Sequence, residues 1–264
     1  IKGEKCSEFL NHVTINNVNK IAAGSAQYSI ICNENGGSVD DVIIYKKGDS
    51  SFFMVVNASN IVKDFEWLCQ KNKYDINISN ESNECSIIAI QGPESRRKIT
   101  DVLDLDIEKL GFYQFSIHNF HNSEIIVSRT GYTGELGFEI LSNHETINDI
   151  WKTLIESNVA PCGLGVRDIL RIEMKYCLYG HELNDDINPI HAGLNWVLDK
   201  KKNNYIGKDS IENEINNPSK RLICFKMIDR AIPRTDYRVF FENNIIGYVS
   251  SGGFSIGLKQ GIGL

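Results

Sequence analysis

Short continuous runs of hydrophobic residues, bounded by turn residues, occur in two early segments of the chain. Residues 40–59, DDVIIYKKGDSSFFMVVNAS, contain two β-branched and aromatic runs separated by Gly48 and Asp49. This pattern predicts two antiparallel strands joined at that turn. A further strand is predicted at 86–91, SIIAIQ, because the Gly92–Pro93 pair that follows it is a stop signal.

Two early helices are predicted from apolar residues at spacings of three and four. One begins at a cap on Ser59 or Asn60, and the other covers residues 94–103. The apolar face of the first helix is formed by Ile61, Val62, Phe65, Leu68 and Cys69.

Two later helices have clearer boundaries. Ser142 and Glu145 have the spacing of a capping box, and the stripe that follows places Trp151 in the core. The stripe consists of Ile147, Ile150, Trp151, Leu154 and Ile155. The other helix is predicted from about Arg167 to Cys177, with Gly180 ending it.

From about residue 205 the pattern changes to short strands, predicted at 221–226, 236–241 and 245–250. A run of strands after a mixed region indicates a separate all-β module. The chain as a whole is therefore predicted to be α+β.

Composition and charge limit the classes of partner. The 264 residues are 42% hydrophobic and 23% charged, which is typical of a globular protein, and the net charge of −6 argues against nucleic acid. No apolar run approaches the length that spans a membrane, and there is no signal-peptide pattern. Neither nucleic acid nor membrane is predicted as a partner.

The seven cysteines are scattered and form no CxxC motif. Such spacing favours free thiols in a reducing compartment over a disulfide framework or a zinc site. The six histidines form no HxxxH or HExxH pattern. No metal site is predicted.

The segment SRTGYTGELGFEI, residues 128–140, contains glycines at 131, 134 and 137 and a carboxylate at Glu139. A phosphate loop would continue into a helix, whereas the residues after Gly137 alternate like a strand. A carboxylate accepts two N–H bonds, so this loop suits a neutral ligand with donors, such as an aminopyrimidine ring. Taken alone, the loop favours a glycine-rich hairpin with a surface glutamate.

Several blocks together resemble the glycine cleavage T-protein family, the tetrahydrofolate-dependent aminomethyltransferases. They occur in the family's order and spacing over nearly the whole chain. The blocks are CNENGGSVDDVIIYK, MVVNASNIVKDFEW, SRTGYTGELGFEI, GLGVRDILRIEMKYCLYGHEL, NPIHAGLNWVL, YIGKDSI and SSGGFSIGL.

The resemblance implies a multidomain cloverleaf around a central folate channel, with a C-terminal all-β module that is barrel- or jelly-roll-like. Residues 1–97 would form an α/β domain that carries the Asp40–Asp41 strand. Residues 98–204 would form an α+β domain with the GYTGE and GLGVRD motifs, and 205–264 the incomplete β module. The family's chains begin earlier and extend further, so segments are expected to be missing at both ends.

The resemblance also implies a reaction. An aminomethyl group on the lipoyl arm of H-protein would pass its carbon to tetrahydrofolate, giving 5,10-methylenetetrahydrofolate and ammonia without a metal. The implied partner is lipoylated H-protein, and the protein is expected to be a monomer. Its implied location is the cytoplasm of a bacterium or the mitochondrial matrix of a eukaryote.

Site residues follow from the positions of the family motifs. Asp41 matches the catalytic aspartate, and Asp40 is expected to be a solvated charge on the opposite face of the strand. Arg167 matches a folate-contacting arginine, with an ion pair to Glu173 or a neighbouring aspartate as its alternative. The implied folate-binding set is Tyr28, Tyr113, Tyr132, Glu139, Arg167 and Trp196. Trp196 is equally suited to the core or to a ligand wall, and Tyr113 stands beside Phe112, which replaces a family tyrosine.

Three alternatives remain open. Another member of the fold, a folate-dependent demethylase or the folate domain of a sarcosine or dimethylglycine oxidase, would share Glu139. A non-enzymatic folate binder of iron–sulfur assembly would need a cysteine in the block YIGKDSI, which has none. The last alternative is an inactive, truncated folate binder.

Overall fold

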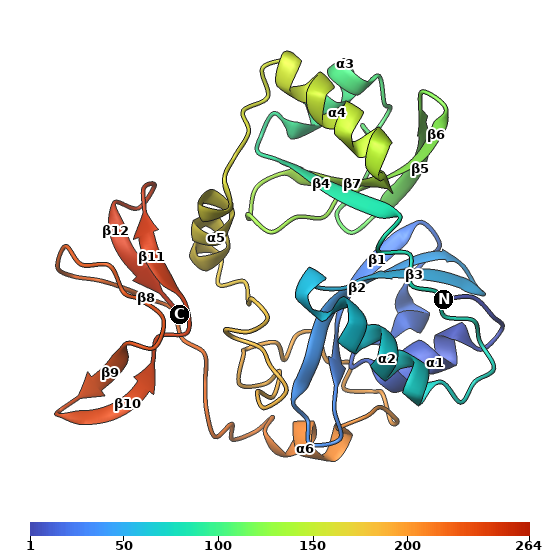
Figure 1. The fold of residues 1–264 in the computed structure, drawn as a ribbon. Helices are drawn as coiled ribbons and strands as arrows, with labels where there is room; N and C mark the ends of the chain where they lie inside the picture. The colour runs from blue at the N-terminus through green and yellow to red at the C-terminus, as the bar shows by residue number, and fades with distance from the viewer.

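The computed structural model describes residues 1–264 and contains three groups of strands (Figure 1). Strands β1–β3 lie beneath a second sheet, and the C-terminal strands lie to one side, with helix α5 between them and the second sheet. The predicted α+β class and the all-β character of the C-terminal strands are confirmed. The small C-terminal sheets do not close into a barrel.

The first sheet is the predicted hairpin with one strand added. Its antiparallel order is β1-β2-β3, and Gly48 pairs with Ser51 at the turn. Its core joins the sheet to helices α1 and α2 and includes Phe9, Ile44 and Leu68. The elements are α1 (Cys6–Val13), η1 (Val18–Lys20), β1 (Ser25–Cys32), β2 (Ser38–Gly48), β3 (Ser51–Val55), η2 (Ala58–Asn60) and α2 (Ile61–Lys71).

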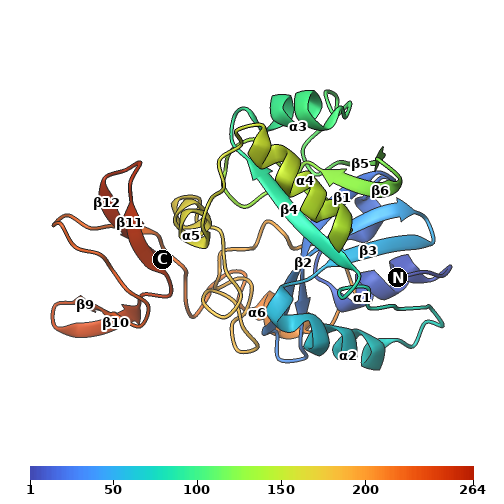
Figure 2. The same ribbon diagram turned by 45° about the horizontal axis from the view of Figure 1, so that its top comes forward.

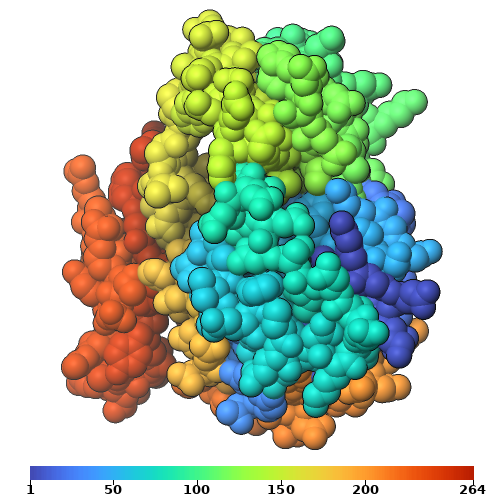
Figure 3. Space-filling view, turned by 45° about the vertical axis from the view of Figure 1, so that its right-hand side comes forward, coloured from blue at the N-terminus to red at the C-terminus, as the bar shows by residue number.

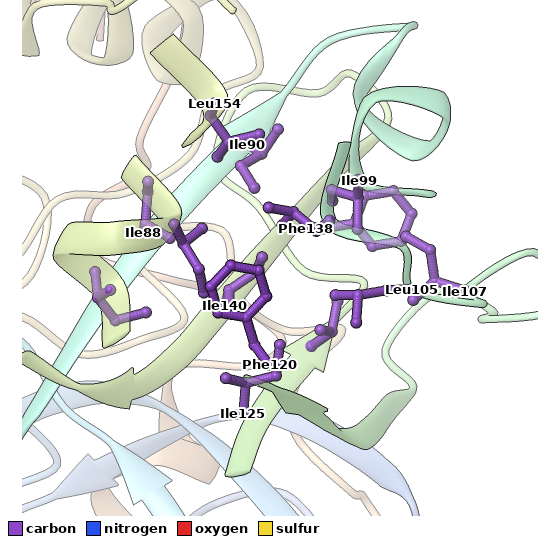
Figure 4. Close-up of a cluster of buried hydrophobic side chains, with 14 of the residues drawn as sticks. Ile88, Ile90, Ile99, Leu105, Ile107, Phe120, Ile125, Phe138, Ile140 and Leu154 are labelled. Carbon is purple, nitrogen blue, oxygen red and sulfur yellow. The ribbon is translucent and has the colours of Figure 1, made fainter. Parts of the chain in front are cut away.

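The second sheet is antiparallel, in the order β4-β7-β6-β5. Helices α3 and α4 cover the face turned away from the first sheet (Figures 1 and 2). The core beneath them includes Ile99, Phe138 and Ile140 (Figure 4). The elements are β4 (Cys85–Gln91), α3 (Ser95–Leu103), β5 (Phe115–Phe120), β6 (Ser123–Ser128), β7 (Gly137–Asn143) and α4 (His144–Glu156).

Helix α4 corrects two predictions. The cap is Asn143, whose Oδ1 accepts the backbone N–H of Thr146 at 2.9 Å, while Ser142 still belongs to β7 and donates to Glu124 O. The capping box was therefore placed one residue early. Trp151 is exposed, so the prediction that it packs in the core was wrong. Its position at the edge of the helix stripe allows solvent contact while Ile150 and Leu154 fill the core.

Helix α5 spans Leu164–Glu173, so it begins and ends earlier than predicted. After it the chain runs without regular helix or strand to the short helix α6 (Lys208–Asn213), which the pattern did not predict. The C-terminal strands are β8 (Phe225–Lys226), β9 (Arg238–Phe241), β10 (Asn244–Tyr248), β11 (Gly252–Ser255) and β12 (Gln260–Gly263). They form a lobe of their own, orange to red in Figure 3.

A third core joins segments that are far apart in the sequence. Ile15, Ile30 and Cys32 from the beginning of the chain pack against residues of the 177–211 segment, including Leu183 and Ile211. Polar bonds reinforce this contact, since Lys202 Nζ donates to Asn16 O at 2.6 Å and also to Thr14 O.

Arg171, a fully buried arginine on α5, connects three parts of the molecule. Its Nε is 2.8 Å from Asp168 on the same helix, and its Nη1 is 2.8 Å from the fully buried carboxylate of Glu182. Its Nη2 donates to Ser251 Oγ in the C-terminal module at 2.7 Å. One guanidinium therefore holds α5, the segment after it and the last module together.

None of the seven cysteines is in a disulfide. Cys6, Cys32 and Cys177 are buried, and burial raises the pKa of the Cys177 thiol to about 12. Buried thiols with a raised pKa react slowly, because the thiolate is the reactive form.

Candidate active site

Asp41 lies on β2 with a donor at each carboxylate oxygen. Asn57 Nδ2 donates to Oδ1 at 2.8 Å, and the Tyr28 hydroxyl donates to Oδ2 at 3.1 Å. Burial, and then the charge of Asp40, raise the pKa of Asp41 to about 6, although these two hydrogen bonds act in the opposite direction. A carboxyl with this pKa exchanges protons near neutral pH, as an acid–base group must.

Asp40 is not the solvated charge that was predicted. Its side chain is 0% exposed, and it accepts bonds from Asn57 N at 3.0 Å, Asn57 Nδ2 at 2.9 Å and Asn60 Nδ2 at 2.7 Å. The prediction failed because β2 is the central strand of its sheet and Asn60, directly before α2, contacts Asp40.

Alternation was also expected to separate Asp40 from Asp41. A single amide nitrogen, Asn57 Nδ2, contacts both carboxylates, so the two side chains are not on fully opposite sides. The pairing of β1 with β2 is irregular between Ile31 and Cys32, directly beside Asp40. Such a bulge turns a side chain away from the regular pleat.

Tyr28 stacks on Trp196, with ring centroids 5.8 Å apart and planes 17° from parallel. Trp196 is 68% exposed, which excludes the core alternative for this residue. Burial and the charge of Asp41 raise the pKa of Tyr28 well above its ordinary value, so its hydroxyl stays protonated and can donate to Asp41. The exposed indole extends the Asp41 site with an open aromatic surface.

Glu139 lies on β7, where one of its oxygens, Oε2, accepts the hydroxyl of Thr130. Thr130 is bonded in turn to Ser128 at 2.8 Å, which lies 3.3 Å from the Tyr45 hydroxyl. The other oxygen, Oε1, has no partner within the chain. The carboxylate is therefore oriented from one side and free to accept a bond on the other.

The glycines of the loop make room for side chains. A Cβ at Gly131 or Gly137 would lie 2.2 Å or 2.0 Å from Gln91 Oε1, and one at Gly134 would lie 2.4 Å from Met174 Sδ. Gln91 in turn accepts the Thr133 hydroxyl at 3.1 Å. The three-residue glycine interval thus follows from close packing around β4 and the end of α5.

Tyr132, in the same loop, stacks on Tyr176 at 5.7 Å, and its hydroxyl donates to Cys177 O. The guanidinium of Arg167 lies over the Tyr132 ring, 4.5 Å from its centroid. Arg167 is exposed and forms no ion pair with Glu173 or a neighbouring aspartate. The paired arginine of α5 is Arg171, one turn further on.

Tyr113 joins the two sheets, because its carbonyl accepts the N–H of Ala26 at 2.7 Å and its own N–H donates to Arg129 O at 3.1 Å. Burial raises its pKa above the ordinary value, and Glu139 and Asp41 are among the groups that raise it further. Burial also raises the pKa of Tyr132, and the charge of Asp41 raises it further. Contacts therefore join Tyr28, Asp41 and Trp196 in one cluster, and Arg167 and Tyr132 in another.

Two residues of these clusters were missed from the sequence. Tyr176 stacks on Tyr132, and Asn57 bridges Asp40 and Asp41. The position of Asn57 could have been inferred from the register of the β2–β3 hairpin. Ile43 pairs with Val55, so continuing two residues along each strand places Asn57 opposite Asp41.

A cavity of about 590 Å³ lies elsewhere, between the ends of α1 and α2 and residues 203–209. Its lining is mostly polar and includes Lys71, Lys73 and Lys208, but none of the predicted site residues. No group of three or more His, Cys, Asp or Glu side chains is placed to hold a metal ion. No helix has the length and apolar character required to cross a membrane.

Two family models of the same protein family match consecutive parts of the chain. The family model of the GCVT N-terminal domain matches residues 1–202, and that of the glycine cleavage T-protein C-terminal barrel domain matches residues 220–264.

Relatives with the name aminomethyltransferase cover the whole chain. The protein of Thermosipho melanesiensis is 39% identical over 267 residues, and that of Bacillus mycoides is 42% identical over 271. The chain spans 73% and 74% of their lengths.

One solved structure is similar throughout. The crystal structure of glycine cleavage system aminomethyltransferase T from Bartonella henselae superimposes with a TM-score of 0.91 at 29% identity. The match covers 99% of this chain and 73% of that one.

Proposed function

The chain belongs to the glycine cleavage T-protein family of aminomethyltransferases, and we propose that it transfers the methylene carbon of aminomethyl-dihydrolipoyl H-protein to tetrahydrofolate. The carbon–sulfur bond of the lipoyl arm breaks, and ammonia leaves the same carbon. New bonds form from that carbon to N5 and N10 of the folate. The products are 5,10-methylenetetrahydrofolate, ammonia and dihydrolipoyl H-protein.

The observation that carries this proposal is the difference between two carboxylates: donors hold both oxygens of Asp41, whereas Thr130 holds only one oxygen of Glu139. A site that binds the planar pterin ring of folate needs a carboxylate that accepts hydrogen bonds from the aminopyrimidine edge. It also needs aromatic side chains against the faces of the ring. The reactive nitrogen of the folate needs an acid–base group at some distance from that carboxylate. The two carboxylates have different surroundings, which suits two different roles.

Glu139 is proposed to grip the pterin through Oε1, which has no partner within the chain, while Thr130 holds Oε2. Asp41 is proposed to exchange the proton of the folate nitrogen that attacks the arm. Tyr28 and Asn57 fix the Asp41 carboxylate, so the proton is exchanged at a defined position.

The remaining predicted residues are proposed as walls of the folate site. Tyr113 and Tyr132 would contact the pterin, and Trp196 would extend the aromatic surface from Tyr28. Arg167, exposed above Tyr132, would meet the carboxylate end of the folate as a bidentate donor. No metal is required for any of these roles.

Lipoylated H-protein is the proposed partner, and a monomer is the proposed state. The relatives compared above come from bacteria, which supports a cytoplasmic location.

The experiment that tests this proposal is an assay with aminomethylated H-protein and tetrahydrofolate, which follows the formation of methylenetetrahydrofolate and ammonia. We expect both products in equal amounts and only when both substrates are present. Turnover of sarcosine or dimethylglycine in place of aminomethylated H-protein would instead identify a demethylase-type member of the fold.

Glu139→Gln is expected to weaken tetrahydrofolate binding by about 1–3 kcal/mol, because an amide NH2 would face ring donors and leave polar groups unpaired. Titration calorimetry with tetrahydrofolate measures the change. Glu135→Gln, on an exposed position of the same loop, is the matched control and should bind normally. Unchanged affinity in Glu139→Gln would mean that this carboxylate does not contact the pterin.

A further inference from the structure

Asp64, in the first turn of α2, has a buried carboxyl group with no conventional partner. The residue is 1% exposed, and neither carboxylate oxygen receives a hydrogen bond from an N–H or hydroxyl group of the chain. The carboxyl group of Asp40 on β2 lies within its reach. Two neighbours of Asp64 along the chain show how closely α2 packs here, since Asn60 Nδ2 donates to Asp40 Oδ1 at 2.7 Å and Lys63 Nζ donates to Val39 O at 2.6 Å. An ionised carboxylate in this position would face another carboxylate without water, which is strongly unfavourable.

The donors of this region show which member of the pair has the charge. Asp40 accepts three N–H bonds from Asn57 and Asn60, whereas Asp64 accepts none. Hydrogen bonds from N–H groups stabilise the charged form of a carboxyl. Asp40 is therefore suited to be the anion, and Asp64 to be the acid that donates to it.

The nearest cation does not neutralise Asp64. Lys63 Nζ donates to Val39 O at 2.6 Å and to the Tyr179 hydroxyl, and lies 3.9 Å from Asp185. The charged and titratable groups around Asp64 are Asp40 on β2, Lys63 on α2 and Asp185 in the segment after α5. Burial, and then Asp40, raise the pKa of Asp64 above its ordinary value, and Lys63 opposes this only in part.

We propose that Asp64 carries a proton at neutral pH, donates it to Asp40, and thereby acts as a positioning residue for Asp41. This inference rests on the proposed function, in which Asp41 is the acid–base group. The pair then has a single negative charge, held on Asp40 by four donors.

Asn57 transmits the effect to Asp41. Its Nδ2 donates to Asp40 Oδ1 at 2.9 Å and to Asp41 Oδ1 at 2.8 Å, so a fixed Asp40 fixes the amide, and the amide fixes Asp41. The charge on Asp40 also favours the protonated form of Asp41. If Asp64 lost its proton, a second charge would repel Asp40 and disturb this alignment.

Asp64→Asn tests the protonation state, because an amide of the same shape also donates to Asp40. A carboxyl that is protonated only in the folded state stabilises the fold fully below its ordinary pKa, and this stabilisation is lost as pH rises toward the raised value. Between about pH 5 and pH 8 the unfolding constant of the wild type should therefore rise about tenfold per pH unit relative to Asp64→Asn. Denaturant unfolding at several pH values measures this ratio.

Asp185→Asn is the matched control, since Asp185 belongs to the same cluster but its side chain is 58% exposed. Its unfolding constant should follow the pH dependence of the wild type. Infrared difference spectra of wild type against Asp64→Asn should show the loss of one protonated carboxyl band at neutral pH. A ratio that does not change with pH, or the absence of this band, would overturn the proposal.

Asp64→Leu tests positioning, because it removes the donor to Asp40. We expect kcat to fall at least tenfold with an unchanged KM for tetrahydrofolate, and Asp64→Asn to restore it. If Asp64→Asn is as slow as Asp64→Leu, Asp64 does not act by donating to Asp40. The unfolding and infrared results do not depend on turnover, so a wild type without aminomethyl transfer would contradict the proposed function and leave the protonated pair established.

Discussion

Asp41→Asn is expected to lower turnover about 10²–10⁴-fold while tetrahydrofolate binds with unchanged affinity. The substitution keeps the shape of the side chain and removes its ability to exchange a proton, which typically contributes a factor of this size. Affinity should persist because the pterin grip is proposed at Glu139, on a different sheet. The assay with aminomethylated H-protein gives the rate, and calorimetry gives the affinity.

Asp49→Asn is the matched control, since Asp49 lies in the turn after the same strand and is fully exposed. In the wild type, activity should fall as pH decreases through about 6, where Asp41 takes up a proton and can no longer accept one. That limb of the pH profile should disappear in Asp41→Asn. Normal turnover in Asp41→Asn would show that another group exchanges the proton.

Arg171→Met is expected to lower the free energy of unfolding by about 3–5 kcal/mol. The substitution keeps much of the side-chain volume but leaves the fully buried carboxylate of Glu182 without its cation. Removing one partner of a buried ion pair has a cost of this size, because the remaining charge is uncompensated. Denaturant unfolding followed by fluorescence measures the loss.

Arg167→Met provides the comparison on the same helix. Arg167 is exposed, and its one aromatic contact, with Tyr132, contributes about 0.5–1 kcal/mol at such a site. Equal losses in the two variants would mean that Arg171 contributes no more than a surface residue. If Arg171→Met does not fold, the free energy of unfolding can be measured for Glu182→Gln instead, because this variant removes the carboxylate of the same ion pair.

Local sequence patterns predicted the strands and helices that have strong periodicity. The β2–β3 hairpin and α3 follow from turn residues and apolar spacing alone. Trp151 shows the limit of this reasoning, because a residue at the edge of a helix stripe is buried only if another element covers it. No element covers it here.

The site was predictable where a motif fixed the position of a residue. Asp41 and Glu139 were chosen from the family motifs alone, because 98 positions of sequence separate them and no local pattern links them. Their roles stay predictions. The burial of Asp40 was not predictable from periodicity, because it depends on contacts with the segment that leads into α2 and on a bulge in β2 beside Asp40. The proton-sharing partner Asp64 has no sequence signal, since it resembles an ordinary acidic residue in the first turn of a helix.

The core shared by Ile15, Ile30 and the 177–211 segment has a consequence for synthesis on the ribosome. Thr14 and Lys202, which meet across this core, are 188 positions apart. At about 5–20 residues per second, roughly 10–40 s pass between the translation of these two residues. Small domains fold in microseconds to seconds. The apolar face of β1 is therefore synthesised long before the 177–211 segment that covers it. Until residues 177–211 have been synthesised, the nascent chain therefore presents an apolar surface that chaperones can bind.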